Sequence, residues 1–342
     1  TASRPRLLDI WRTRLCTGTG TPTNAATARP TGSARNLDQR RGRAVPGNLH
    51  QYGLVQSDEA VQATERAAKL RGLDFAGARV LRIGENGVVA LPAAGLLARV
   101  IAGADILDQV EHEITVARWL EREGIPVVEP SGSPVVVGDL VVAFWEYLRD
   151  AHSADLPTLA KFLQRLHRLR APAGLLKPVE PFERFDARLA AVEVLTGPDR
   201  DLLRGLRDEL AAGWQEARFE LGVATVHGDA HMDNLLRTQS GRIAAIDLET
   251  VAEGPPEWDL TLTALYFECG WFTRAQYDEF AGTYGYDVRS SSAWPMLRGI
   301  RMVRMVTWLA QSAGDHPDRQ AQLRHRLDTL RDGTAPTGWS GY

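Results

Sequence analysis

A strand, a loop and a further apolar strand between residues 224 and 249 constrain this chain more than any other segment. The apolar residues Ala224–Val226 predict the first strand, and a second apolar run ends at Ile246. The loop at 227–234 opens with His-Gly and carries Asp229 and, five residues later, Asn234; Asp247 follows the second strand. One short unit thus presents two acids and an amide in a set order.

The chemistry of these side chains favours phosphoryl transfer. That reaction needs a carboxylate facing a hydroxyl nucleophile, and an Asn and a second Asp that hold magnesium against the phosphates. The spacing from Asp229 to Asn234 matches the catalytic loop of kinases. Oxygen ligands suit a hard cation such as Mg²⁺. A zinc site is not expected, because no Cys or third His accompanies His227 and His231.

Length and composition are ordinary for a soluble globular protein, and the low cysteine content fits the cytoplasm. The 342 residues suit one large domain or two lobes. No apolar run approaches the roughly 20 residues of a membrane span, so no membrane partner is expected. The two cysteines, Cys16 and Cys269, exclude a disulfide framework. The oligomeric state is not predictable from these features.

The first 50 residues are predicted to be a basic, disordered tail. Residues 1–47 carry nine Arg, no Lys and two Asp, a charge of +7, and they contain few aliphatic side chains. A transit peptide or a tether to nucleic acid are alternatives for this segment. The net charge of -3 leaves -10 for the remainder, which would attract a cationic substrate and repel nucleic acid. An acidic surface that aids solubility is the simpler alternative.

Residues 51–148 are predicted to form a β-rich, nucleotide-binding lobe. A helix over 57–71, with Ser57 or Asp58 as its cap, precedes the strands, and a second helix covers 106–124. The expected strands are 78–83, 88–91, 96–101, 127–130, 135–137 and 140–145.

A nucleotide site can be placed on this lobe by analogy with a kinase-type site. The turn with Gly84, Asn86 and Gly87 would lie over the phosphates. Arg99 stands in the third strand, where a Lys usually contacts the α- and β-phosphates, and it leaves the choice between ATP and GTP open. Glu113, in preference to Glu111, would pair with Arg99. The backbone near Glu146 and Leu148 would be the hinge that binds the adenine.

Residues 149–342 are predicted to form a helical catalytic and substrate lobe. Leucines at a spacing of three to four residues indicate a helix from Leu156, in which His167 is expected to be structural. Further helices are expected at 183–196, 199–218, 259–267, 274–282, 295–313 and 317–331.

The motif His227-Gly228-Asp229-x-His231-x-x-Asn234, followed by Ile246-Asp247, resembles the aminoglycoside phosphotransferase family, whose wider relatives include choline-type and other small-molecule kinases. The resemblance extends over about residues 78–335 and includes Trp258-Asp259-Leu260. It implies an α+β, bilobal, protein-kinase-like fold. Carried over residue by residue, it implies that Asp229 is catalytic and that Asn234 and Asp247 bind magnesium. His227 would brace the loop and Asp259 would anchor its backbone, while His231 and Glu249 would lie next to the metal site.

The acceptor is expected to lie between the loop and the later helices. Carboxylates and aromatic faces there suit an amine-bearing substrate. The candidates are Asp150, Glu253, Glu257, Glu268, Trp271 and Phe272. The leading hypothesis is an ATP- and Mg-dependent kinase for an aminoglycoside or a similar natural product, with a role in antibiotic resistance. Alternatives are a metabolic kinase for choline, homoserine or a sugar derivative, and a nucleotide-binding regulatory pseudokinase.

Overall fold

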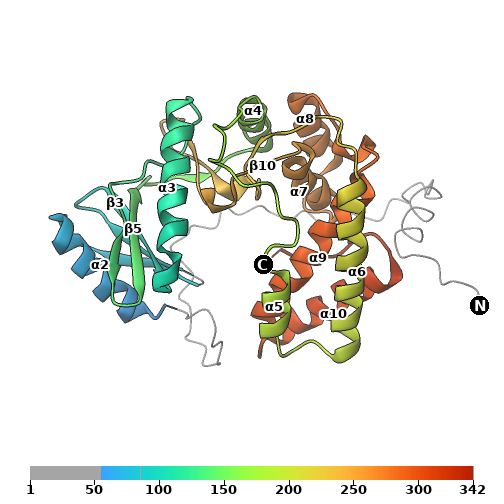
Figure 1. The fold of residues 1–342 in the computed structure, drawn as a ribbon, viewed down its shortest axis with the longest axis horizontal. Coiled ribbons are helices and arrows are strands. Elements are labelled where there is room, and N and C mark those ends of the chain that lie inside the picture. The colour runs from blue at the N-terminus through green and yellow to red at the C-terminus, as the bar shows by residue number, and fades with distance from the viewer. Residues whose placement is uncertain (1–54, 85, 342) are drawn as a thin grey trace, which may run out of the picture.

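The computed structural model describes residues 55–84 and 86–341. A small part built on a β-sheet lies beside a larger helical part, as the α+β prediction requires (Figure 1). The predictions for the tail at 1–50 lie outside the described residues. In the described part, no helix is long and apolar enough to cross a membrane.

The β-rich part is an antiparallel sheet of five strands in the order β1-β2-β3-β5-β4. Its strands are β1 (Arg79–Ile83), β2 (Gly87–Leu91), β3 (Leu96–Ala102), β4 (Val135–Val137) and β5 (Leu140–Glu146). In the central pair, Leu96 lies opposite Glu146 and Ala102 opposite Leu140. The predicted strands at 78–83, 88–91, 96–101, 135–137 and 140–145 are therefore confirmed.

Both faces of the sheet are covered, which explains the continuous apolar run of β5. Leu140, Val142 and Phe144 belong to the core cluster under helix α2 (Ser57–Arg71). The alternate residues Val141, Ala143 and Trp145 belong to a larger cluster that includes helix α3 (Leu107–Arg122). Successive side chains of a strand point to opposite faces. Helix α3 therefore lies between the sheet and the helical part (Figure 1).

Two details of this part differ from the sequence prediction. Gln56, not Ser57 or Asp58, caps α2, and its capping box includes Glu59. The segment 127–130 makes only isolated bridges, from Val127 to Ala245 and from Pro130 to Trp145. A proline has no N–H for a ladder, so the prolines at 126 and 130 keep this segment from extending into a strand.

The helical part is organised around α9 (Trp294–Ala313), which contacts four neighbouring helices. These are α5 (Phe185–Ala191), α6 (Gly197–Glu216), α7 (Glu257–Glu268) and α10 (Pro317–Asp332). Helices α4 (Leu156–Leu166) and α8 (Arg274–Tyr284) pack on each other. The helix predicted at 183–196 is shorter because Val192 is extended and Thr196 already caps α6.

The central segment forms short strands at the junction of the two parts. Strand β7 (Ala224–Val226) pairs with β10 (Ala252–Gly254), and β8 (Leu235–Arg237) pairs with β9 (Ile243–Ala245) and β6 (His152–Ser153). The expected single strand up to Ile246 is thus a hairpin. Two single turns of 3₁₀ helix complete this segment. η3 (Met232–Asn234) lies directly before β8, and η4 (Leu248–Thr250) follows β9. The lobe boundary after Leu148 stays a prediction.

Candidate active site

The loop after β7 requires glycine at position 228. Gly228 has φ +87°, and a Cβ there would lie 2.1 Å from the carbonyl oxygen of Thr250. No L-side chain can be accommodated against that backbone oxygen without a shift of the chain. The hydroxyl of Thr250 donates to the carbonyl of His227 at 2.9 Å, which ties η4 to the loop. The close approach sets the direction in which Asp229 leaves the loop.

Asp259 of α7 holds the start of the loop. Its carboxylate accepts the backbone N–H groups of His227 at 2.6 Å and Gly228 at 2.8 Å, the contacts expected of it from the sequence. His167 Nε2 lies 3.0 Å from the same carboxylate, and His167 Nδ1 lies 2.8 Å from the Tyr284 hydroxyl. Burial raises the pKa of Asp259, whereas the hydrogen bond from His167 and the charges of the nearby histidines lower it. The lowering effects are larger together, so the pKa of Asp259 lies below its usual value.

Arg301 and Trp258 hold the other side of the loop. Both donate to the carbonyl oxygen of Gly228, Trp258 Nε1 at 3.0 Å and Arg301 Nη2 at 2.8 Å. The Arg301 guanidinium also lies 4.0 Å from the ring centre of Trp258, within cation–π range. The Gly228–Asp229 peptide is therefore fixed from two helices.

Asp229 presents an ionised carboxylate at the surface of this fixed loop. Its side chain is 42% exposed, although Arg301 Nη1 lies 3.5 Å from Oδ1 and His231 Nε2 lies 3.6 Å from Oδ2. Burial by surrounding atoms raises the pKa of Asp229, but the His231 hydrogen bond and the Arg301 charge lower it well below its usual value. Such a carboxylate can accept a hydrogen bond from a hydroxyl.

Asn234 and Asp247 follow at the end of the loop and after β9. Asn234 is buried, and its amide nitrogen donates to the carbonyl of Asp229 at 3.0 Å, which leaves its side-chain oxygen for another partner. The N–H of Ile246 donates to the carbonyl of Asn234 at 3.0 Å, so Asp247 follows directly on the residue bonded to Asn234. His227 Nε2 lies 3.0 Å from the Ile246 carbonyl. Asp247 has φ +56° and a side chain that is 48% exposed.

These two residues fit a hard cation that also binds phosphate oxygens. Among the described residues, no group of three or more His, Cys, Asp or Glu could hold a metal ion. Asn234 and Asp247 offer oxygen donors, the kind that Mg²⁺ uses together with substrate phosphates. Glu249 lies on η4, which packs on α3, and its charge acts on Arg99 and Glu113.

Arg99 and Glu113 form a buried ion pair between β3 and α3. Glu111 is exposed on the same helix, so Glu113 is the partner, as expected. Arg99 Nη1 also lies 3.9 Å from Asp247 Oδ1. Burial lowers the pKa of Arg99, but Glu113 and Glu249 raise it, and the net change is upward. The pair directs a permanent cation towards Asp247.

The hairpin turn between β1 and β2 has a structural reason for one of its glycines. A Cβ on Gly87 would lie 2.9 Å from Cβ of Ala60 in α2, because the helix packs closely on the hairpin. The N–H of Gly84 donates to the carbonyl of Asn86 at 3.2 Å. A role of this turn over the phosphates stays a prediction.

The segment expected to be the hinge connects to the β8–β9 turn. The Glu146 carboxylate pairs with Arg242, with Nη2 and Oε2 2.7 Å apart. The N–H of Tyr147 donates to the carbonyl of Gly95 at 3.0 Å. A hollow of about 400 Å³ lies beside this segment. It is lined by Glu146, Tyr147, Leu148, Arg149, Asp150, Thr238, Gln239, Ser240 and Arg242.

Three of the substrate candidates have partners within the protein. Glu257 is fully buried and accepts the N–H of Leu221 at 3.0 Å, so the expectation of a direct ligand contact is wrong for Glu257. Glu268 pairs with the buried Arg298, and Trp271 donates its N–H to the carbonyl of Trp339.

The remaining substrate candidates lie on separate segments of the fold. Glu253 is exposed on β10, Asp150 is exposed beside the hinge hollow, and Phe272 is half-buried near Tyr266. The structure therefore does not bring the predicted acids together around Asp229.

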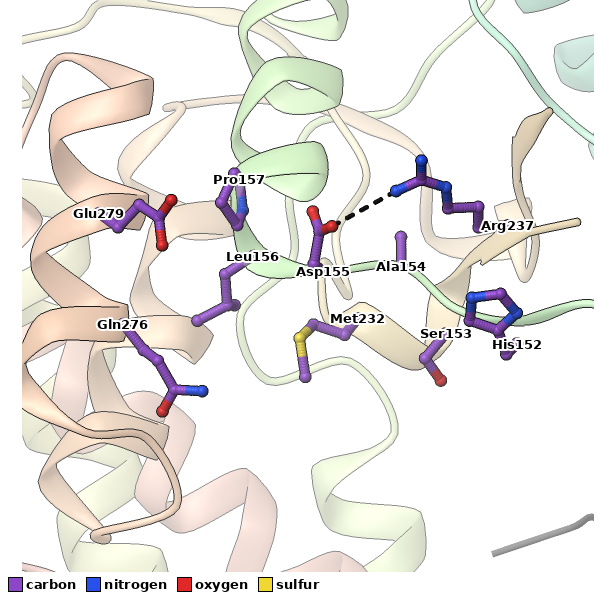
Figure 2. A pocket seen from close by; sticks show the side chains of 10 residues that line it. All are labelled: His152, Ser153, Ala154, Asp155, Leu156, Pro157, Met232, Arg237, Gln276 and Glu279. Carbon is purple, nitrogen blue, oxygen red and sulfur yellow. Dashed lines mark hydrogen bonds and ion pairs between the residues drawn. The ribbon is translucent and has the colours of Figure 1, made fainter. Parts of the chain in front are cut away.

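Another cavity, of about 450 Å³, lies beside η3 (Figure 2). Asp155 caps α4 there by accepting the N–H of Thr158 at 2.8 Å, and it pairs with Arg237 at 3.4 Å. Ser153 donates to Asp233 of the loop at 2.5 Å. The lining is formed by residues 152–157 together with Met232, Arg237, Gln276 and Glu279.

Sequence reasoning missed the cationic side of the site. Arg301 and Arg304 lie in a largely apolar helix that also contains Arg298, and both are at least half-buried. Three arginines at a spacing of three residues in such a helix are the signal that could have identified them. His167 was expected to be structural, and its contact with Asp259 agrees with that interpretation.

Comparison with solved structures places this arrangement in a known fold. An amicoumacin kinase, hAmiN, solved with AMP-PNP, Ca²⁺ and Ami, is 16% identical with a TM-score of 0.65, over 83% of this chain and 97% of that chain. An aminoglycoside phosphotransferase from Streptomyces rimosus is 19% identical with a TM-score of 0.55, over 70% and 98%. The choline kinase LicA from Streptococcus pneumoniae is 18% identical with a TM-score of 0.55, over 79% and 98%. The predicted kinase-like fold is thereby confirmed.

Sequence comparison identifies the family. No curated protein matches the sequence. The profile of the phosphotransferase enzyme family matches residues 73–300, which include Arg99, Glu113, the loop with Asp229 and most of the helices behind it. The match spans most of the chain, and the protein therefore belongs to the phosphotransferase enzyme family.

Proposed function

We propose that this protein transfers the γ-phosphate of ATP to a hydroxyl of a small molecule and that Asp229 is its catalytic residue. The observation that carries the proposal is the exposed, ionised Asp229 carboxylate on a loop fixed by Asp259, Trp258 and Arg301. Phosphoryl transfer depends mainly on positioning and electrostatics, which a fixed loop supplies.

Asp229 has one role at each stage of the transfer. Its carboxylate accepts a hydrogen bond from the acceptor hydroxyl and orients the oxygen towards the γ-phosphorus. As the new P–O bond forms and the bond to the β-phosphate oxygen breaks, the hydroxyl proton passes to Asp229. The low pKa of Asp229 keeps it unprotonated before transfer and releases the proton to solvent afterwards.

The nucleotide and the cation would be held by residues from both parts. Asn234 and Asp247 would bind Mg²⁺, which supplies positive charge against the phosphates, while His231 and Glu249 lie nearby. Arg99, held by Glu113, would bind the α- and β-phosphates under the turn with Gly84, Asn86 and Gly87. Glu146 and Leu148 would be at the adenine. AMP-PNP and ADP in similar structures support ATP, with GTP as the alternative.

For the acceptor, an aminoglycoside or another amine-bearing natural product is the first candidate. Support comes from the similar structures, among them a spectinomycin phosphotransferase that is 15% identical. Such an activity would confer antibiotic resistance. A metabolic kinase acting on a choline, homoserine or sugar derivative is the second candidate, supported by the choline kinase likeness. Either kinase would act in the cytoplasm, where ATP is available. Residues 51–148 would form its nucleotide-binding lobe and residues 149–342 its catalytic and substrate lobe.

A test separates both candidates from a regulatory pseudokinase. ADP release is measured with aminoglycosides, peptide antibiotics, amino alcohols and sugars for the wild type, Asp229→Asn and the control Asp233→Asn, an exposed neighbour in the loop. We expect Asp229→Asn to lower acceptor-stimulated turnover by about 10²–10⁴-fold. Nucleotide binding without any Asp229-dependent turnover would refute the kinase proposal and favour the pseudokinase.

A further inference from the structure

Two arginines of α9 lie next to the loop that carries Asp229. Arg301 and Arg304 are three residues apart and so lie on the same face of the helix. Their guanidinium groups lie 4.0 Å and 5.5 Å from the ring centre of Trp258. Trp258 in turn donates to the carbonyl of Gly228. Arg304 thus contacts a tryptophan that is itself hydrogen-bonded to the catalytic loop.

The two arginines differ in their partners. Arg301 has the carboxylate of Asp229 at 3.5 Å and the carbonyl of Gly228 at 2.8 Å. Arg304 is half-buried, and Nη1 donates to the carbonyl of Pro181 at 3.0 Å. No carboxylate of residues 55–84 or 86–341 lies within ion-pair distance of Arg304. Among the described residues, no other hydrogen bond of the Arg304 guanidinium is found, so the remaining N–H groups of its planar fork have no protein partner there.

The charges around Arg304 leave an excess of positive charge. Burial lowers the pKa of Arg304 to about 10, and the charges of Arg301 and Arg188 lower it too, while Asp229 and Glu183 raise it. The guanidinium remains protonated at neutral pH. Since Asp229 already interacts with Arg301, its charge is shared between the two arginines. A second anion beside Arg304 would offset the cost of burying this cation.

We propose that the acceptor carries an anionic oxygen group, a carboxylate or a phosphate, which binds Arg304 while the acceptor hydroxyl lies at Asp229. The guanidinium fork matches the geometry of both groups and can bind them through two hydrogen bonds. The inference rests on the proposed kinase function and makes Arg304 a specificity-determining residue. An acceptor whose only charges are amines would meet repulsion from Arg301 and Arg304, and such repulsion is a common source of specificity.

The inference narrows the two acceptor candidates. A hydroxylated compound with both an amine and an acidic group suits Arg304 and also the acidic body of the protein. The predicted acids Glu257 and Glu268, which would have recognised a purely cationic acceptor, have partners inside the fold. A metabolic kinase that acts on an acidic acceptor is therefore favoured over a kinase that acts on a purely cationic antibiotic.

The test uses pairs of acceptors that differ in one acidic group. L-homoserine is compared with 3-amino-1-propanol, D-glycerate with glycerol, and ribose 5-phosphate with ribose; streptomycin and choline serve as purely cationic probes. ADP release is measured for the wild type, Arg304→Gln, Arg304→Lys and the control Arg324→Gln, an exposed arginine of α10. The first two pairs report a preference for carboxylate, and the third reports a preference for phosphate.

The expected result is a preference of the wild type for the acidic member of at least one pair. Arg304→Gln should remove that preference by raising KM for the acidic acceptor about 10- to 100-fold, the loss typical of a charge-assisted hydrogen bond. The kcat should change little, because Arg304 does not touch the reacting atoms. Arg304→Lys should restore part of the KM, and Arg324→Gln should behave as the wild type. A merely structural role of Arg304 would lower stability without a selective change in KM.

Turnover of streptomycin or choline that needs Asp229 but not Arg304 would overturn the inference and leave the kinase function intact. If no acceptor is phosphorylated, the anion site is tested by measuring the thermal unfolding temperature in sodium sulfate and in sodium chloride of equal ionic strength. A sulfate stabilisation that Arg304→Gln reduces and Arg324→Gln keeps supports the anion site, and equal stabilisation of all three proteins refutes it. Failure of the kinase function is recognised separately, by the absence of ATP binding in calorimetry.

Discussion

Arg301 Nη1 lies 3.5 Å from Asp229 Oδ1, and Arg301 Nη2 lies 2.8 Å from the carbonyl oxygen of the preceding residue, Gly228. One buried guanidinium thus fixes the backbone of the loop and the ionisation of the carboxylate that the loop presents.

Replacing Arg301 should disturb both effects. We expect Arg301→Gln to lower kcat by about 10²-fold, because a small displacement of a catalytic group is costly. The pKa of Asp229 should rise towards its usual value, since a cation that lowers it is removed. The acid limb of the kcat profile would therefore move to higher pH. An acid limb that lies at the same pH in Arg301→Gln and in the wild type would contradict this account. The control is Arg324→Gln, a change at an exposed arginine.

The close approach at Gly228 makes a prediction for stability. Gly228→Ala places a Cβ 2.1 Å from the Thr250 carbonyl, whereas Gly222→Ala has a similar φ of +73° and open space around it. Both variants carry the strain of a left-handed residue, about 1–2 kcal/mol. We expect Gly228→Ala to lower the free energy of unfolding by clearly more than Gly222→Ala in urea denaturation. Equal losses would show that the loop moves without cost.

The buried pair of Arg99 and Glu113 should be sensitive to removal of one partner. Glu113→Gln leaves the Arg99 guanidinium buried without its carboxylate, a change that typically costs about 3–5 kcal/mol. Glu111→Gln, on the exposed side of the same helix, should change stability by at most about 0.5 kcal/mol. Calorimetric titration with ATP should show weaker binding only for Glu113→Gln. Unchanged affinity would mean that Arg99 does not depend on Glu113 for its position.

Asp259 predicts a dependence of stability on pH. Its pKa is lower in the folded protein than the ordinary value of 3.8. Its contribution is therefore present above that value and is lost as the pH falls through the folded pKa. Asp259→Asn should be less stable at pH 7, by about 1.5–3 kcal/mol for the lost charged hydrogen bonds. The difference from the wild type should shrink below about pH 4.

The check is urea denaturation of both proteins between pH 3 and pH 7. Asp278→Asn, which removes an exposed ion pair with Arg274, is the matched control and should show a difference below about 1 kcal/mol. A constant difference between the wild type and Asp259→Asn over the whole pH range would show that Asp259 does not titrate as proposed.

The local elements were predictable where a short-range pattern sets them. Each of these patterns lies within a few consecutive residues. They are the apolar runs of β5 and its neighbouring strands, the spacing of Leu156, Leu159 and Leu163 in α4, and the motif around Asp229. The errors fall where context decides. The segment at 127–130 has strand composition, but its flanking prolines leave it only single bridges. Helix α5 stops early because Thr196 caps the next helix.

The amino-acid sequence by itself determined the order of Asp229, Asn234 and Asp247, the pairing preference of Arg99 for Glu113 and the division into a β-rich and a helical part. Only the tertiary structure decided which charges face the loop. Glu257 and Glu268 found partners inside the protein, while Arg301 came to lie beside Asp229 and Arg304 beside Trp258. The physical reason is that ion pairing and burial act between segments far apart in the chain, so their outcome depends on how α7 and α9 pack.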